Sequence, residues 1–278
     1  AKNYKAMHMS WLHCSWGLGA MIGPAIMSSF IATGNNWRTG YLVVGIIQLG
    51  IAVLLFATLP LWKKVQKKKE DGDIEKKVVT KPMPILKTLK KRGVIFSVLA
   101  FFFYCSIEVL TSIWGASFLI YVKNASVSAA ALWISFYYAG ITAGRFLNGL
   151  LAIKIKSDTL IRIGFGTLLA GIILIILPFG NAFTIVGFIL LGTGCAPIFP
   201  SLIHLAPYRF GEEYSSTVIA LQMAVAYTGF ALTPLLFGAV VKYLSFNLFP
   251  FILLAVAFGS FVCTELAAFL TKKKTVTQ

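Results

Sequence analysis

Eight long apolar stretches, each about as long as a bilayer is thick, make up most of this chain. A helix needs roughly 20 apolar residues to cross the hydrocarbon core. The stretches lack the period-two alternation of barrel strands, and a helix satisfies its own backbone hydrogen bonds in lipid. The sequence therefore predicts an all-α polytopic membrane protein, with transmembrane helices at residues 9–33, 39–62, 94–122, 129–151, 160–179, 182–204, 214–241 and 245–271.

Composition supports this class and excludes a water-soluble globular domain. Apolar residues make up 58% of the 278 residues and charged residues only 12%, with a mean hydropathy of +0.83. Soluble domains are nearer half apolar and a quarter charged. The few charges are therefore informative by their positions.

The basic residues gather on one side of the predicted membrane. Lys and Arg number 25 against 9 Asp and Glu, a formal net charge of +16. If residues 1–8 lie in the cytoplasm and the spans alternate, only Arg38, Lys123 and Lys242 of the basic residues face outward. Cytoplasmic loops of membrane proteins carry such an excess. The sequence predicts a multi-pass protein of the cell membrane with both ends of the chain cytoplasmic.

The longest polar segment, residues 63–93, divides the chain into residues 1–62, with two predicted spans, and residues 94–278, with six. It contains lysine clusters around an acidic patch but no aromatic residue. Nucleic-acid surfaces interleave aromatic and basic side chains, so we expect no nucleic-acid partner. We expect a solvated basic linker between a two-helix unit and a six-helix bundle, with contact to anionic lipid left open.

The sequence gives little sign of enzymatic or cofactor chemistry. A membrane-embedded enzyme needs paired acids, a histidine-rich metal site or an activated nucleophile. The chain has three scattered histidines, and its four cysteines lie at irregular spacing inside apolar stretches. We expect no enzyme, no cofactor, no metal site and no disulfide framework.

The first and last predicted hairpins resemble each other. A shift of 210 residues places Gly19 on Gly229, Pro24 on Pro234 and residues 63–64 on residues 273–274, without a gap. The second copy follows four further spans, whereas the first copy follows none. A repeat of this kind predicts that roughly 115 to 120 residues are absent upstream, so that the chain is the C-terminal part of a protein with two six-span halves.

Several motifs resemble one family of transporters. They are WGLGAMIGP at residues 16–24, GRFLNG at 144–149, GTGCAPIFPSLI at 192–203, APYRFG at 206–211 and LQMA at 221–224. Together they are similar to the fifth, eighth, tenth and eleventh spans of the fucose-permease-like sugar branch of the major facilitator superfamily. The superfamily's Asp-Arg pair is replaced by residues 150–152, Leu-Leu-Ala, which puts the latch that such a pair supports in doubt for this half.

The resemblance implies a secondary transporter that lacks its first four spans. Such a protein would move a sugar or similar small polar solute by alternating access, with symport of a proton, of sodium or of neither left open. The alternatives are a non-transporting sensor or scaffold with the same fold and, less favoured, a membrane-embedded enzyme.

Glu108 is the one acid at the middle of a predicted span. An ionised carboxylate at the bilayer centre costs about 2.5 kcal/mol or more, so such residues usually face a cavity and mark a substrate or ion path. We expect Glu108 to carry a proton or to accept hydrogen bonds from solute hydroxyls. The alternative is a permanently neutral carboxyl bonded to a neighbouring helix.

Other polar side chains at membrane depth are candidates for solute binding. Amide, hydroxyl and indole groups bind polyhydroxylated solutes through paired donors and acceptors and through an aromatic face. The alternative for each is an interhelical hydrogen bond or interface anchoring. These candidates are Gln222, Trp114, Asn148, Tyr104 and Tyr138.

Two further charged residues lie nearer the ends of their spans. We expect Arg145 either to latch a cytoplasmic gate with Glu212 or Glu213 or to extend to water. Glu265 lies about two helical turns from the basic tail, so its carboxylate is expected to reach the interface.

Glycines and prolines predict close packing and bendable points. We expect Gly19 with Gly23, and Gly140 with Gly144, to form small-residue packing faces, so that leucine at Gly23 or Gly144 disrupts folding or gating. Helix interruptions are expected at Pro24, Pro197, Pro200 and Pro234, with close packing at Gly192, Gly194 and Gly229.

Overall fold

The computed structural model describes residues 6–33, 37–70 and 83–272, and the described residues contain helices and no strands. Eight helices or helix pairs are long and apolar enough to cross a membrane, which confirms the predicted all-α polytopic class. They are α1 (Ala6–Ala32), α2 (Trp37–Glu70), α4 (Val94–Tyr121), α5 (Val127–Leu151), α6 (Ser157–Ile176), the pair α7 (Asn181–Cys195) and α8 (Ile198–Phe210), α9 (Glu212–Tyr243) and α10 (Phe249–Thr271).

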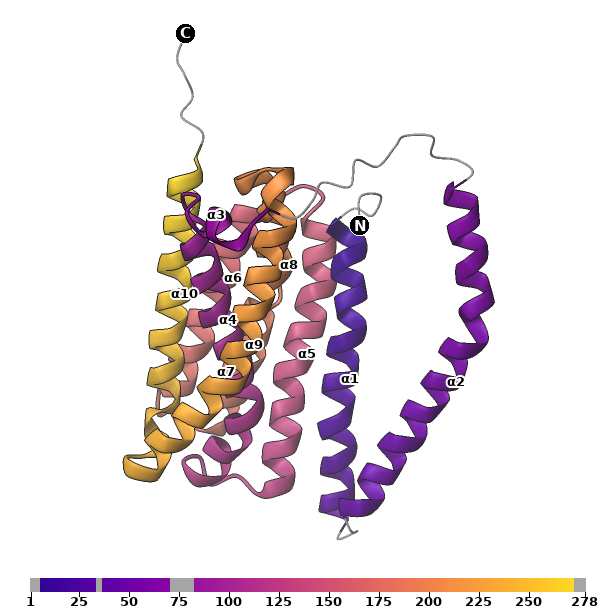
Figure 1. Cartoon of the computed structure of the whole chain (residues 1–278). Coiled ribbons are helices and arrows are strands. Elements are labelled where there is room, and N and C mark those ends of the chain that lie inside the picture. Colours follow the sequence, from indigo (N-terminus) through magenta and orange to yellow (C-terminus); the bar gives the residue numbers. More distant parts are fainter. Residues whose placement is uncertain (1–5, 34–36, 71–82, 273–278) are drawn as a thin grey trace.

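Two short helices complete the described structure, α3 (Ile85–Leu89) before α4 and the 3-10 helix η1 (Phe246–Leu248) before α10. Figure 1 shows the long helices running up and down, with the start of α1 and the end of α10 at the same end. We call this end, which includes α3, residues 152–156 and the α8–α9 junction, the basic end. The opposite end is the far end.

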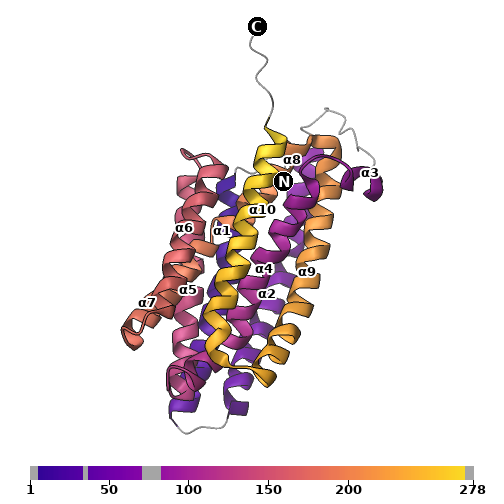
Figure 2. The same ribbon diagram turned by 90° about the vertical axis from the view of Figure 1, so that its left-hand side faces the viewer.

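The apolar core is centred on α4. Large side chains such as Phe101, Leu110 and Phe118 are almost completely buried, and α4 packs against α9, α10 and α5. A helix that is apolar all round its circumference is expected to be buried. Figure 2 shows α6 and α7 on one side of α4 and α10, and α9 on the other. Among the residues that the structure describes, the buried members of the apolar cluster around α4 all lie in residues 101–257.

Helix α7 lies between α5 and α6 with glycines at both contacts. A methyl group at Gly192 would collide with the carbonyl oxygen of Tyr137, and one at Gly140 with that of Ile189. On the other face, a methyl group at Gly171 would lie 2.6 Å from the carbonyl oxygen of Gly187. We call this arrangement the glycine seam, formed by Gly140, Gly144, Gly164, Gly171, Gly187, Gly192 and Gly194.

Helix α1 runs antiparallel along α5. The Cys14 thiol donates to the carbonyl oxygen of Thr142 at 3.6 Å, and the Ser28 hydroxyl donates to that of Ser128 at 2.9 Å. Gly17, between them, faces Thr142. Helix α2 meets α1 at the far end and leans away from the other helices toward the basic end (Figure 1), and none of its residues 41–61 is buried.

The described residues do not form the predicted packing face of Gly19 and Gly23. A methyl group at either position meets nothing within 4 Å. Positions 19 and 23 lie on a different face of the helix from Cys14, Gly17 and Ser28, which face α5, because each residue advances by 100° around the helix. Gly17 is therefore the glycine that lets α1 approach α5.

The substitution Gly23→Ala is expected to leave the stability of the chain within about 0.5 kcal/mol of its original value, because the added methyl group enters open space. The matched substitution Gly17→Ala is expected to destabilise it, since the methyl group would collide with the Thr142 hydroxyl. Thermal unfolding of both variants in detergent checks this. Equal losses in the two would contradict the packing described for α1.

The prolines act differently from one another. Pro24 and Pro234 lie inside continuous helices, so the predicted interruptions at these two positions are wrong. Membrane helices tolerate such prolines. The carbonyl oxygen of Pro234 itself accepts a hydrogen bond from the Trp114 indole at 3.1 Å, which joins α9 to α4. The span predicted at residues 182–204 does break, between Cys195 and Ile198. Pro197 precedes α8 and Pro200 lies in its first turn, where a missing amide hydrogen is tolerated.

Candidate functional site

Glu108 lies at the middle of α4 and is 7% exposed. The Tyr104 hydroxyl lies 2.6 Å from its Oε1 atom, and a guanidinium nitrogen of Arg145 lies 3.4 Å from the same oxygen. Arg145 itself is only 4% exposed. The structure therefore surrounds the central carboxylate with one cation and one hydroxyl.

Helix direction explains how the two charges meet. Side chains on a helix lean toward its N-terminus. Helix α4 starts at the basic end and α5 starts at the far end (Figure 1), so Glu108 leans toward the basic end and Arg145 leans toward the far end. The two side chains consequently approach each other from antiparallel helices.

Both sequence expectations for Arg145 are corrected by this geometry. Its burial contradicts extension to water, and its ion pair is with Glu108 rather than with the predicted gate acids. Glu212 and Glu213 lie in the first turn of α9 at the basic end. The sequence signal that was missed is the need of a lone buried acid for a buried counter-charge.

The Tyr104 hydroxyl connects Glu108 to the end of α7. Its oxygen also lies 2.9 Å from the carbonyl oxygen of Cys195, the last residue of α7. A phenol has one hydrogen to donate. If Glu108 is ionised, that hydrogen can satisfy the carboxylate; if Glu108 is protonated, the carboxyl donates to Tyr104 and Tyr104 donates to Cys195. The protonation state of Glu108 thus decides whether the Tyr104 hydroxyl donates to Glu108 within α4 or to Cys195 at the end of α7.

Further groups extend this arrangement across α5 and α1. The Tyr138 hydroxyl donates to Ser112 at 2.8 Å, and Ser112 donates to the backbone carbonyl of Glu108 at 2.7 Å. The Trp16 ring lies 4.8 Å from the Arg145 guanidinium and packs edge-on against Tyr138. We call these six residues the Glu108 site: Trp16, Tyr104, Glu108, Ser112, Tyr138 and Arg145.

Of the predicted solute-binding residues, Tyr104 and Tyr138 join Glu108, and Asn148 is buried one helical turn beyond Arg145 on α5. Trp16 and Ser112 were not among the predicted site residues. Ser112 follows Glu108 by four residues, so helical spacing was a usable signal. Trp16 reaches the site only through the packing of α1 on α5, which spacing does not show.

Gln222 and Trp114 do not lie at the Glu108 site. Gln222 donates to the Ser97 hydroxyl at 2.9 Å, and Ser97 is about 16 Å along α4 from Glu108 at 1.5 Å per residue. Trp114 donates to Pro234 and packs against Phe237. Both residues connect α4 to α9.

Two ion pairs tie helices together outside the site. Arg162 on α6 binds Glu265 on α10 through two hydrogen bonds of 2.8 Å, so Glu265 reaches another helix. Arg209 at the end of α8 binds Asp158 in the first turn of α6 at 2.6 Å. The Arg162–Glu265 pair is exposed, and an exposed pair contributes about 0–1 kcal/mol. Neither pair is part of the Glu108 site.

Within the described ranges, no three His, Cys, Asp or Glu side chains form a group that could hold a metal ion. The four cysteines are free thiols. The Glu108 site can hold a proton, exchange an ion pair for a neutral hydrogen bond, and offer hydroxyl and aromatic groups. Its groups are therefore chemically capable of binding a proton and of hydrogen bonding.

Solved structures share the fold of this chain. It is similar to a Major Facilitator Superfamily transporter, FucP, in the outward conformation, with a TM-score of 0.54 and 17% identity over 85% of this chain and 55% of that one. A variant of the E. coli fucose:proton symporter FucP gives a TM-score of 0.50 and 15% identity over 68% of this chain and 45% of that one. At this level of identity the likeness establishes the fold.

Two curated relatives are similar in sequence. The glucose/mannose transporter GlcP of Bacillus subtilis (strain 168) is 27% identical over 242 residues, which cover 84% of this chain and 57% of GlcP. The hexuronate transporter of the same organism is 30% identical over 142 residues, 47% of this chain and 31% of that protein. The matched part of the chain therefore spans 57% of the length of GlcP and 31% of that of the hexuronate transporter.

The family model described as Major Facilitator Superfamily matches residues 1–234, from the start of the chain into α9. The match includes α1, α2 and every residue of the Glu108 site. Together with the eight apolar helices, it shows that this chain belongs to the Major Facilitator Superfamily.

Proposed function

We propose that this chain acts in the secondary active transport of a sugar or similar small polar solute across the cell membrane, and that Glu108 carries a coupling proton. The observation that carries the proposal is the mid-span ion pair of Glu108 and Arg145, with its Tyr104 hydrogen bond. The names of the related proteins, which refer to glucose, mannose, hexuronate and fucose with protons, support the solute class.

Proton binding would rearrange the site in a defined way. In the ionised state, Glu108 neutralises Arg145 and accepts the Tyr104 hydrogen. Protonation removes the charge of Glu108, releases Arg145 from its ion pair and directs the Tyr104 hydrogen to Cys195 at the end of α7. A released guanidinium is a strong multiple donor, so a solute hydroxyl or carboxylate would bind best in the protonated state. Binding of the two would then be coupled.

The solute contacts follow from the groups beside the ion pair. We assign hydrogen bonding to Asn148, Tyr138 and Arg145, and stacking against sugar C–H groups to Trp16. Trp16 is 51% exposed, which leaves a face of the indole accessible. Gln222 and Trp114 are assigned to packing between α4 and α9 because the Gln222 amide nitrogen and the Trp114 indole nitrogen donate hydrogen bonds between these helices.

We also propose the domain division and the orientation that the sequence predicts. The core cluster of residues 101–257 supports a separate six-helix unit at residues 94–278, with residues 1–62 a two-helix unit of a first half. That four further spans precede this unit stays a prediction. The excess of lysine and arginine at the basic end supports a cytoplasmic location for that end and for both ends of the chain.

Substitution Glu108→Gln tests the proton role. In cells that express the complete gene that encodes this chain, uptake of labelled glucose, mannose, hexuronate and fucose is measured against external pH, with and without a proton uncoupler. We expect uptake of at least one sugar to rise as external pH falls and to collapse with the uncoupler. Glu108→Gln is expected to remove the pH dependence, because an amide cannot bind or release the proton.

Glu265→Gln is the matched control, because it makes the same chemical change in an exposed ion pair away from the site. It is expected to keep the original pH profile. An unchanged profile in Glu108→Gln would overturn the proton role while leaving transport intact. No uptake of any sugar by the unsubstituted product of the complete gene would favour a non-transporting sensor or scaffold.

A further inference from the structure

A crevice of about 450 Å³ opens at the basic end between α3, the start of α4 and the end of α10. Its walls are apolar side chains, Leu86, Leu89, Ile95 and Leu270, and its rim is the run Lys90, Lys91 and Arg92. The basic run directly precedes Gly93 and the first residue of α4, Val94. Cations therefore border an apolar hollow where a membrane-spanning helix begins.

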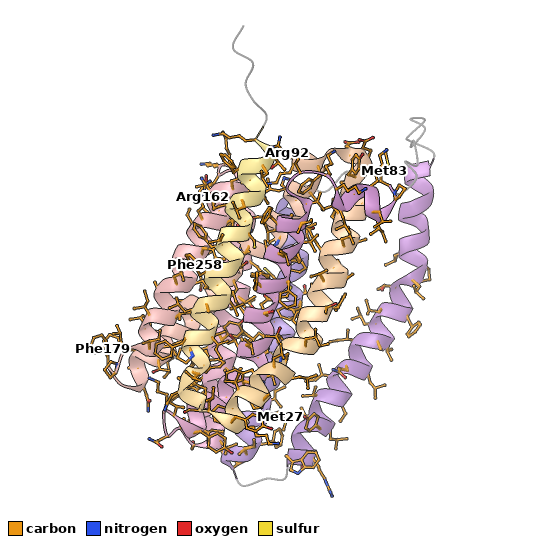
Figure 3. All side chains as sticks on the ribbon, turned by 60° about the vertical axis from the view of Figure 1, so that its left-hand side comes forward. Met27, Met83, Arg92, Arg162, Phe179 and Phe258 are labelled. Carbon is orange, nitrogen blue, oxygen red and sulfur yellow. The ribbon has the colours of Figure 1, made fainter. Side chains whose placement is uncertain are left out.

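The backbone holds this corner in place. Gly93 has a φ of 84°, a left-handed conformation that side chains other than glycine disfavour. A methyl group there would lie 2.9 Å from the Thr271 side chain and 3.3 Å from the carbonyl oxygen of Ala267. The turn from α3 into α4 is consequently seated on the last turn of α10. Figure 3 shows Arg92 at this end of the bundle, beside the end of α10.

The three cations of the rim have different surroundings. Lys91 donates to the carbonyl oxygen of Phe210 and lies 3.8 Å from the centre of the Tyr214 ring, so it is engaged with α8 and α9. Lys90 and Arg92 on either side of it are exposed, and neither pairs with an acid of the residues that the structure describes. Two unpaired positive charges thus border the crevice.

The chemistry of the crevice fits a phospholipid better than a small anion. Ile85, Leu86 and Ile95 are 57%, 75% and 52% exposed, so apolar surface continues from the crevice onto the outside of α3 and α4. A small anion would use the cations alone, whereas a lipid uses both surfaces. Basic pockets between membrane helices bind anionic headgroups in other proteins.

We propose that this crevice binds an anionic phospholipid, with the headgroup phosphate at Lys90 and Arg92 and an acyl chain along Leu86 and Ile95. The crevice lies at the start of α4, whereas Trp114 lies toward the other end of that helix. Half the length of α4 separates the crevice from Glu108. The inference depends on the membrane-spanning fold and not on the solute that the protein moves.

Lipid binding by the purified full chain tests the proposal. The chain, in a neutral detergent, is titrated with phosphatidylglycerol or with phosphatidylcholine of the same acyl chains, and bound lipid is measured by native mass spectrometry. We expect phosphatidylglycerol to be retained more tightly than phosphatidylcholine. The double variant Lys90→Gln/Arg92→Gln is expected to weaken phosphatidylglycerol binding by roughly 30-fold, because each basic residue near an anionic headgroup contributes about a five-fold factor.

The control is Lys154→Gln/Lys156→Gln, which removes two exposed lysines from the same end of the bundle but outside the crevice. It is expected to retain phosphatidylglycerol as the original chain does. A second variant, Leu86→Gln, changes an exposed residue and leaves every charge in place. It is expected to weaken phosphatidylglycerol binding without affecting the fold.

Three outcomes would overturn the site. Equal weakening by the two double variants would indicate a diffuse positive surface. Equal retention of the two lipids would exclude headgroup selection. If inorganic phosphate displaced bound phosphatidylglycerol as effectively as added phosphatidylglycerol does, and if Leu86→Gln had no effect, the crevice would be a small-anion site in place of a lipid site.

Discussion

The substitution Arg145→Ala is expected to lower the free energy of unfolding by about 3–5 kcal/mol, the usual effect of removing one partner from a buried ion pair. Glu108 would remain 7% exposed at the middle of α4 with its cation gone. The variant also loses the contact of the guanidinium with the Trp16 ring. Chemical unfolding of the purified chain in detergent measures the loss.

Two comparisons separate the missing charge from the missing side chain. The double variant Glu108→Gln/Arg145→Ala removes both charges and is expected to recover much of the stability. Lowering the pH is expected to do the same for Arg145→Ala alone, because a protonated carboxyl carries no charge. Arg162→Ala breaks an ion pair whose arginine side chain is 55% exposed, and it is expected to lose no more than about 1 kcal/mol. Similar losses in Arg145→Ala and Arg162→Ala would show that the central pair is not energetically distinct.

The substitution Gly192→Ala is expected to have the second largest effect, a loss of about 1–3 kcal/mol or more. Its methyl group would overlap the carbonyl oxygen of Tyr137 and lie 3.0 Å from the amide nitrogen of Ile141. Both atoms belong to the backbone of α5, so no side chain can rotate away. Relief requires α7 to move, and α6 blocks its other face.

Gly166→Ala on α6 is the matched control, since a methyl group there meets nothing within 4 Å. It is expected to leave the thermal midpoint unchanged or slightly raised, because alanine favours helix more than glycine does. A normal midpoint in Gly192→Ala would mean that α7 can shift away from α5, and the close packing of the glycine seam would not limit the fold.

The membrane spans were predictable because length and apolar composition alone determine them. The boundaries were less so. Helix α2 continues to Glu70, eight residues beyond the predicted end of its span at residue 62, since lysine and glutamine are good helix formers and do not end a helix outside the hydrocarbon. The sixth span was predicted as one segment, although its prolines were recognised as points of interruption, and it breaks at Pro197. The helices that contain Pro24 and Pro234 are continuous.

The site was predictable in its centre and not in its surroundings. Glu108 is identified by a charge at mid-span, and Tyr104 lies four residues before it on the same helix. Arg145 was misjudged because distance along a helix was taken as depth in the membrane, without the lean of a long side chain toward the helix N-terminus. Trp16 depends on α1 packing against α5, a contact between segments more than 100 residues apart.

The glycine seam has a mechanical consequence for the helices beside it. The backbone of α7 packs closely against the backbones of α5 and α6. These three helices are therefore expected to resist sliding past one another and to move as one rigid body. The seam stops at Gly194, and the next two residues lead into the proline that precedes α8. We therefore expect bending to occur most easily between α7 and α8. The Tyr104 hydroxyl bonds to Cys195 at the end of α7, where the close-packed helices meet the α7–α8 break. The position of the Tyr104 hydroxyl hydrogen is therefore expected to affect bending at this break.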